Sequence, residues 1–152
     1  ALGCKVSATT HREKKLPLLK EADQAVLDPG ELAGRLPGVT KALELVGPKT
    51  LGDTLNCMEK GGIVCNTGIL GGIYGIRYFD PIKFIPNGVY LTGFHSNWPS
   101  QKVMDEIFTF LEEHKLTPCL GKAFPFSSVR EACIAQDQGA VEGKIVVYME
   151  EI

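Results

Sequence analysis

The sequence has 152 residues, of which 44% are hydrophobic and 22% charged, and its net charge is −2. This length is enough for one domain with a sizeable core. The near-neutral charge gives no bulk attraction for a nucleic acid backbone or an anionic membrane. No apolar run is long enough to cross a bilayer, and no signal-peptide pattern opens the chain. We therefore expect a cytoplasmic protein with no nucleic acid or membrane partner.

The five cysteines, at positions 4, 57, 65, 119 and 133, form no C-x-x-C pair. An odd number of cysteines without a signal peptide predicts reduced thiols in a cytoplasm-like compartment. The three histidines do not cluster with the cysteines along the sequence. Because zinc sites need characteristic ligand spacings, we expect no zinc site within this chain.

Short apolar, β-branched runs alternate with longer mixed runs along most of the chain. This alternation is typical of repeated βα units around a parallel sheet, and it predicts an α/β fold. The predicted strands are Cys4–Thr9, Gln24–Leu27, Lys41–Val46, Ile63–Thr67, Val89–Phe94 and Lys144–Tyr148.

Helices are predicted between these strands from capping residues and apolar spacing. Ser128 and Glu131 form the capping-box pattern S-x-x-E ahead of the last helix. The predicted helices are Glu13–Glu21 with Pro17 inside it, Gly47-Pro48 to Gly61-Gly62, Pro81–Ile85, Ser100–Lys115 and Ser128–Asp137.

In open parallel sheets, ligands bind beyond the carboxyl ends of the strands. After the first predicted strand stand Thr9, Thr10, His11 and Arg12, followed by Lys14-Lys15, with no acid in the turn. Hydroxyls and cations at such a position suit the 2′-phosphate of NADP, whereas an acid would bind the 2′-hydroxyl of NAD. A solvated basic helix start is the alternative interpretation.

Glycines follow two further strands, as Val46-Gly47-Pro48 and Thr67-Gly68. Glycine lets a ligand approach the backbone closely, although ordinary turn glycines would look the same. The segment Gly68–Gly75 does not fit G-x-G-x-x-G, so we predict no phosphate-binding turn there. No nucleophile–base pair is visible, and the catalytic residues stay unknown. His95, at the end of a strand, is interpreted as a structural or surface histidine rather than a catalytic one.

Five segments in the same order resemble the nucleotide-binding half of the medium-chain dehydrogenase/reductase superfamily. The similarity is strongest to the zinc-independent quinone oxidoreductase (zeta-crystallin-like) branch. The matching segments are 1–6, Thr9–Arg12, Leu43–Gly47, Lys60–Gly68 and Glu142–Val147.

The resemblance implies a Rossmann-like, doubly wound, mostly parallel sheet with helices on both faces, binding NADP(H). In that family hydride passes from NADPH to a quinone, an enone or a similar carbonyl compound, and the cofactor carries the chemistry. The family often forms homodimers through the strand that corresponds to Val89–Phe94, which would cover a sheet edge. The residues implied in cofactor binding are Thr10, Arg12 and Lys15 at the 2′-phosphate with Thr9 beside them, Val46 and Gly47 along the ribose–nicotinamide path, and Thr67, Gly68 and Ile69 at the nicotinamide end.

The sequence lacks the family's catalytic domain, its first Rossmann strand and its glycine-rich turn. We therefore expect a truncated NADP-binding domain at 1–117 and a segment at 118–152 that returns toward the absent domain. A gap is expected between the strands at Cys4 and Lys41, and the chain alone should be inactive and bind NADPH poorly, because that turn anchors the pyrophosphate.

Two alternatives stay open at this point. One is a fragment of a zinc-dependent alcohol dehydrogenase, and the other is a non-catalytic domain for dimerisation or nucleotide sensing. A methyltransferase is disfavoured because the turn after the first strand has no acid.

Overall fold

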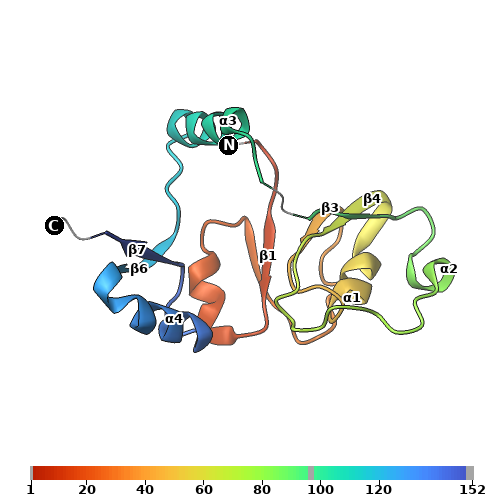
Figure 1. The fold of residues 1–152 in the computed structure, drawn as a ribbon. Helices are drawn as coiled ribbons and strands as arrows, with labels where there is room; N and C mark the ends of the chain where they lie inside the picture. The colour runs from red at the N-terminus through yellow and green to blue at the C-terminus, as the bar shows by residue number, and fades with distance from the viewer. Residues whose placement is uncertain (1, 96–97, 150–152) are drawn as a thin grey trace. The chain divides into compact units, whose positions relative to one another are not determined.

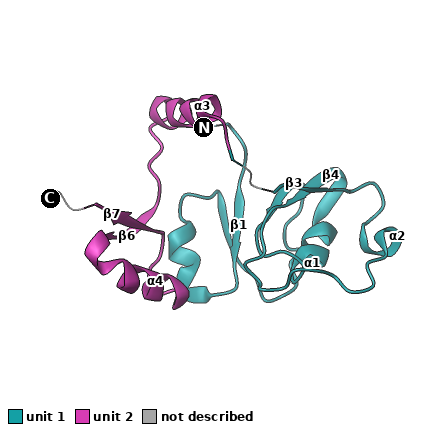
Figure 2. Cartoon of the chain, in the orientation of Figure 1, with its two compact units in different colours: residues 1–98 teal, residues 99–152 magenta. Residues whose placement is uncertain are grey.

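The computed structural model describes residues 2–95 and 98–149. The chain divides into two compact units, Ala1–Trp98 and Pro99–Ile152 (Figure 2). Each unit contains short parallel strands joined by helices (Figure 1), which confirms the predicted α/β class with parallel sheets. The domain boundary expected between positions 117 and 118 stays a prediction. None of the helices within the described ranges is long and apolar enough to cross a membrane.

The first unit begins with a two-stranded parallel sheet made of β1 (Ser7–Thr10) and β2 (Gln24–Leu27). β2 has the predicted bounds, but β1 starts later than predicted, because the Val6 amide donates to the Asp23 carboxylate at 2.7 Å. The connection is a 3-10 helix, η1 (Glu13–Leu19), instead of the expected α-helix. Pro17 lies inside it and has no amide hydrogen to donate, so a regular α-helix cannot form there.

The same unit contains a three-stranded parallel sheet in the order β3 (Val39–Glu44), β4 (Met58–Asn66) and β5 (Tyr90–Gly93). β4 starts at Met58 and passes through Gly61-Gly62, which were expected to end a helix. The prediction was wrong because the pairing of β4 with β3 shifts register between Met58 and Ile63, so the glycines lie in an irregular part of the strand.

One face of this sheet packs on α1 (Leu51–Asn56) and forms the core of the unit. The buried side chains are Leu51, Leu55 and Val64, and the last two are fully inaccessible to solvent. Half-buried residues from the sheet and the following loop complete this cluster: Ala42, Met58, Ile76, Phe84, Ile85, Val89 and Leu91. The predicted short helix at Pro81 is present as α2 (Pro81–Phe84), and Asp80 caps it by accepting from the Ile82 amide at 3.1 Å.

Successive strand residues point to opposite faces of a sheet, so the neighbours of the core residues line the other face. There, large hydrophobic side chains are exposed, among them Leu43 (65%), Tyr90 (63%) and Phe94 (59%).

The second unit contains α3 (Gln101–Glu113) and a β–α–β segment. That segment consists of β6 (Leu120–Pro125), η2 (Phe126–Ser128), α4 (Val129–Asp137) and β7 (Lys144–Tyr148), with β6 parallel to β7. α3, α4 and β7 were predicted, whereas β6 was not. Ser100 caps α3 by accepting from the Val103 amide at 3.4 Å, but Ser128 makes no side-chain cap, so the expected capping box is absent.

Replacing Leu55 with Ala should lower the free energy of unfolding by about 2–4 kcal/mol, because it removes buried contacts and leaves a cavity beside Val64. The matched control is Leu70→Ala, where the side chain is 82% exposed and the change should stay within about 0.5 kcal/mol. Urea unfolding followed by circular dichroism measures both. Equal losses in the two variants would contradict the assignment of the core.

Candidate functional site

The chain segments that follow β3 and β4 lie against each other at the carboxyl end of the sheet. The Leu70 amide donates to the Leu45 carbonyl at 3.1 Å, and the Gly71 amide donates to the Val46 carbonyl at 2.9 Å. These two segments contain Val46, Gly47, Thr67, Gly68 and Ile69, so the structure brings one group of the sequence-predicted residues together.

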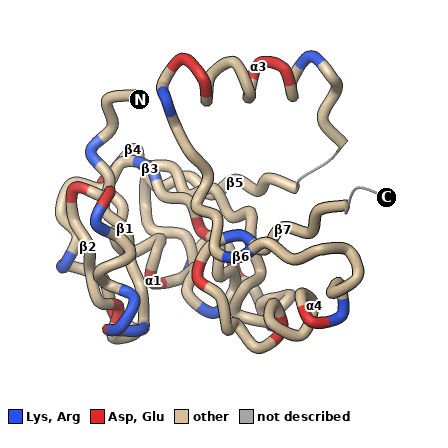
Figure 3. Tube along the Cα trace, turned by 90° about the vertical axis from the view of Figure 1, so that its left-hand side faces the viewer, with Lys and Arg blue, Asp and Glu red and all other residues tan. Residues whose placement is uncertain are grey.

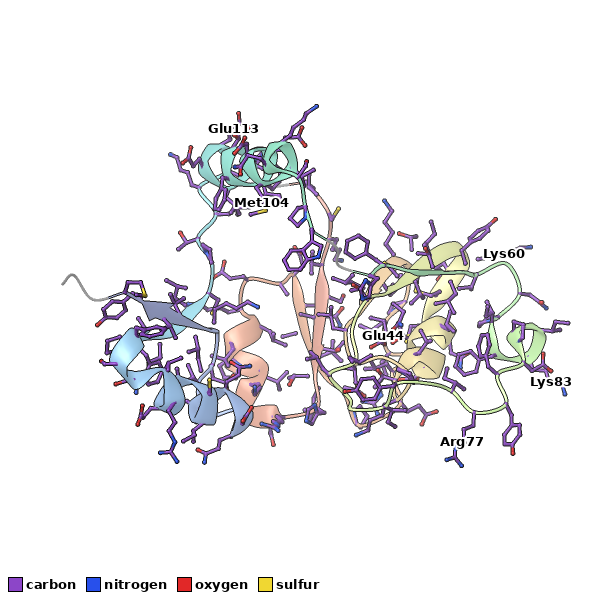
Figure 4. All side chains as sticks on the ribbon, viewed as in Figure 1. Glu44, Lys60, Arg77, Lys83, Met104 and Glu113 are labelled. Carbon is purple, nitrogen blue, oxygen red and sulfur yellow. The ribbon has the colours of Figure 1, made fainter. Side chains whose placement is uncertain are left out.

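Glu44, the last residue of β3, is buried at this end of the sheet and was not anticipated from the sequence. Glu44 is 4% exposed, and it is the only charged residue that is buried among those that the structure describes. Its Oε1 accepts from the amides of Val46 (2.8 Å) and Gly47 (3.0 Å) and from the Thr50 hydroxyl (2.9 Å). Its Oε2 accepts from the hydroxyl of Thr54. Figure 4 shows Glu44 inside the ribbon near α1, while Lys60 and Arg77 extend outward.

The main chain of Glu44 also holds the second segment. Its carbonyl accepts from the amides of Thr67 at 3.0 Å and Gly68 at 3.2 Å. Side chain and carbonyl together therefore fix the start of both segments. A pattern in the sequence could have indicated this residue: a glutamate inside an apolar strand, followed by Gly-Pro and by threonines at 50 and 54.

Gly47 and Gly68 are required by the contact between the two segments. Gly47 has φ +90°, and a Cβ placed on it would lie 2.5 Å from the Gly68 carbonyl oxygen. A Cβ on Gly68 would overlap the carbonyl of Leu45. We expected these glycines to make room for a ligand; in the structure the space is taken by the chain itself.

Among the described residues, several polar groups at this edge have no hydrogen-bond partner. Within residues 2–95, no hydrogen bond uses the Ile69 amide or the Thr67 carbonyl. The Oδ1 atom of Asn66, at the end of β4, is buried and also has no partner in the described chain. Since buried polar atoms normally find a partner in protein, water or ligand, the buried Asn66 Oδ1 indicates that this edge suits a polar ligand.

The other predicted residues, Thr9, Thr10, Arg12 and Lys15, lie at the carboxyl end of β1. The Arg12 amide donates to the Thr10 hydroxyl at 3.2 Å, and the Lys15 amide donates to the Arg12 carbonyl at 2.9 Å. Arg12 is exposed, and its Nε donates to Nε2 of His11 at 3.3 Å. Figure 3 shows basic and acidic segments interleaved along β1, β2 and their connection.

These two groups of predicted residues belong to separate sheets. In the described chain β1 pairs with β2 but not with β3, so the expected gap between the strands is not closed by hydrogen bonds. The structure therefore forms two clusters, one at the end of β1 and one at the ends of β3 and β4.

No group of three metal-ligating side chains occurs within the part of the chain that the structure describes. The cysteines in these ranges are free thiols. His95 is exposed just beyond β5. We therefore assign no chemical step to a metal held by these residues.

Replacing Gly68 with Ala should destabilise the protein by about 2 kcal/mol or more, because its Cβ and the Leu45 carbonyl cannot occupy the same space. Gly75→Ala is the control, since a Cβ there meets no atom within 4 Å. Thermal unfolding of the two variants would show the difference. An unchanged midpoint for Gly68→Ala would mean that the segments are not in close contact.

Cys57 should react slowly with iodoacetamide. Burial, with Asp53 and Asp28 adding to it, raises its pKa to about 11. The thiolate is the reactive form, so the labelling rate at pH 8 should lie well below that of the exposed Cys133 and should keep rising with pH toward 11. Peptide mass spectrometry over a pH series measures both rates, and denatured protein serves as the control. Equal rates in the folded protein would contradict the expectation.

Several solved structures of other proteins are similar to this chain. The structure of AibC matches with a TM-score of 0.83 and 26% sequence identity, over 98% of this chain and 43% of AibC. An NAD-dependent alcohol dehydrogenase matches with a TM-score of 0.78 and 24% identity, over 97% of this chain and 45% of that protein. YHDH of E. coli K-12, solved with bound NADPH, matches with a TM-score of 0.72 and 23% identity, over 96% of this chain and 47% of YHDH.

These likenesses show the Rossmann-like fold of dehydrogenase nucleotide-binding domains, and the chain spans less than half the length of each of the three proteins. No curated protein matches the sequence. The family model described as zinc-binding dehydrogenase matches residues 21–147. Because this match covers most of the sequence, the chain belongs to the zinc-binding dehydrogenase family.

Proposed function

We propose that this chain is the NADP(H)-binding part of an oxidoreductase that transfers hydride from NADPH to a quinone, an enone or a similar carbonyl compound. The observation that carries the proposal is the cluster of Val46, Gly47, Thr67, Gly68 and Ile69 at the carboxyl ends of β3 and β4. Ligands of open parallel sheets bind at this edge. The family match and the NADPH-bound relative support a nicotinamide cofactor there.

At the nicotinamide end, the chain offers one donor and one acceptor. The Ile69 amide and the Thr67 carbonyl have no hydrogen-bond partner within residues 2–95, and a carboxamide needs one group of each kind. The bound cofactor would supply the hydride, and these residues would fix the orientation of its ring.

At the adenosine end, Thr10, Arg12 and Lys15 would bind the 2′-phosphate. Arg12 is exposed at the end of β1, so a ligand can reach it. Charge-assisted hydrogen bonds from a guanidinium to a phosphate are among the strong ones. Their loss should weaken the binding of NADPH, which carries the 2′-phosphate, but not that of NADH.

A zinc-dependent alcohol dehydrogenase is the second candidate. It is favoured by the description of the family as zinc-binding and by the similarity to an NAD-dependent alcohol dehydrogenase. Metal analysis of the whole protein, together with activity on a panel of quinones and alcohols, distinguishes the two. Zinc at one equivalent with alcohol oxidation would favour the second candidate.

Replacing Arg12 with Ala should weaken NADPH binding by about tenfold or more and leave NADH binding almost unchanged, because only NADPH carries the 2′-phosphate. Lys14→Ala, a neighbouring exposed cation, is the control and should have a small effect on both. NMR titration of the protein with each cofactor, which also measures weak binding, gives the affinities to be compared. Equal losses for NADPH and NADH would remove the 2′-phosphate assignment.

We also propose a homodimer formed through β5, extending the expectation for Val89–Phe94. β5 is an edge strand of the β3–β4–β5 sheet in the described chain, and an open edge can pair with a second copy. The Phe94 amide donates to Asn66 on β4 at 3.1 Å, so by alternation the Gly93 amide points to the open edge. Leu91, in contrast, packs on the core cluster and is unsuitable for testing the edge.

Replacing Gly93 with Pro should therefore shift the protein from dimer to monomer without unfolding it, since proline removes the outward amide hydrogen and is tolerated on edge strands. Sedimentation velocity measures the oligomeric state, and circular dichroism confirms that the variant is folded. A folded variant that still dimerises would exclude pairing through β5.

A further inference from the structure

We propose that Glu44 is a positioning residue for the nicotinamide half of the cofactor and has no effect on the adenosine half. This inference rests on the proposed function, and it deepens it by dividing the site into two parts that can be changed separately.

Glu44 is buried, and its carboxylate has no ion-pair partner among the described residues. None of the ion pairs found in the described ranges involves it, and its carboxylate is satisfied by two amides and two hydroxyls. Burying a carboxylate costs free energy even when it is hydrogen-bonded, and an apolar residue at a core position often stabilises as well or better. What the carboxylate provides here is a defined direction for several backbone groups.

The backbone groups that Glu44 holds are close in the chain to the groups proposed to bind the nicotinamide. The side chain of Glu44 fixes the amides of Val46 and Gly47, and its carbonyl fixes the amides of Thr67 and Gly68. Neither the Thr67 carbonyl nor the Ile69 amide has a partner within residues 2–95. The Thr67 carbonyl shares its peptide unit with the Gly68 amide, and the Ile69 amide belongs to the next unit. The carboxylate reaches these groups through the first segment, because the Leu45 carbonyl accepts from the Leu70 amide and the Val46 carbonyl from the Gly71 amide. Glu44 itself is too deeply buried to touch a ligand.

The adenosine half is held independently of Glu44. Thr10 and Arg12 follow β1, which pairs with β2 in a different sheet. Every side-chain hydrogen bond of Glu44 given by the structure goes to positions 46–54. A loss of the carboxylate should therefore change the contacts of the nicotinamide half and leave the phosphate contacts as they are.

The experiment compares two ligands, NADP⁺ and 2′,5′-ADP, which carries the adenosine 2′-phosphate but no nicotinamide. Amide chemical shifts of the chain are followed by NMR titration, which also measures weak binding. In Glu44→Ala, we expect NADP⁺ affinity to fall by about tenfold and 2′,5′-ADP affinity to change by less than about twofold. Glu44→Gln should restore most of the NADP⁺ affinity, because its oxygen can accept the three Oε1 bonds and its amide can donate to Thr54.

Glu59→Gln is the matched control, since Glu59 is an exposed glutamate that accepts from a backbone amide, that of Gly38, at 3.2 Å. It should leave both affinities unchanged. If Glu44→Ala does not fold, Thr54→Val removes one donor to the carboxylate and should give a smaller loss with the same selectivity for NADP⁺.

Equal losses of NADP⁺ and 2′,5′-ADP in a folded Glu44 or Thr54 variant would overturn the inference. So would a wild-type chain that binds the two ligands equally well, because the nicotinamide half would then contribute nothing, although the adenosine site would stand. A wild-type chain whose amide shifts respond to neither ligand, so that even the weak binding expected without the glycine-rich turn is absent, would overturn the proposed function and this inference with it.

Discussion

The carboxylate of Glu44 is the interaction on which the arrangement at the end of the sheet depends. A buried carboxylate must receive several donors, and four of them are supplied by the ten residues that follow it. Because the carboxylate accepts from the amides of Val46 and Gly47, the chain turns away from the strand direction after Glu44. β3 therefore ends at Glu44 and not at Val46, where the apolar run predicted its end. Accepting from Thr50 and Thr54 ties the start of α1 to the same point, and α1 supplies the buried Leu51 and Leu55.

The second constraint is the close approach of the segments after β3 and β4. The backbone at Gly68 lies so near to Leu45 that no side chain fits between them, and Gly47 adopts a φ that favours glycine. Two adjacent parallel strands thus end in segments that are hydrogen-bonded to each other. A site formed in this way depends on backbone direction more than on the identity of exposed side chains.

The sequence predicted the parallel α/β class and the bounds of β2 and β7, because hydrophobic alternation and turn residues reflect local rules. The prediction from the sequence was wrong where contacts between residues far apart in the chain determine the secondary structure. Gly61-Gly62 looked like a helix end, yet pairing with β3 keeps them in β4. β6 has no β-branched residue and ends in Pro125, and its pairing with β7 is what makes it a strand. The candidate site residues came from a resemblance, while Glu44 was missed because burial of a carboxylate is a property of the folded chain.

The irregular pairing near Gly61-Gly62 gives the sheet one regular end and one irregular end. Between Ile63 and Asn66, β4 is in register with both of its neighbours, and this part leads into the cluster. Between Met58 and Ile63, β4 contains more residues than the stretch of β3 that it faces. Extra length in such a bulge is accommodated locally by bending of the strand. The bulge therefore separates the start of β4, which follows α1 after the single residue Cys57, from the regular part of the strand that ends in the cluster.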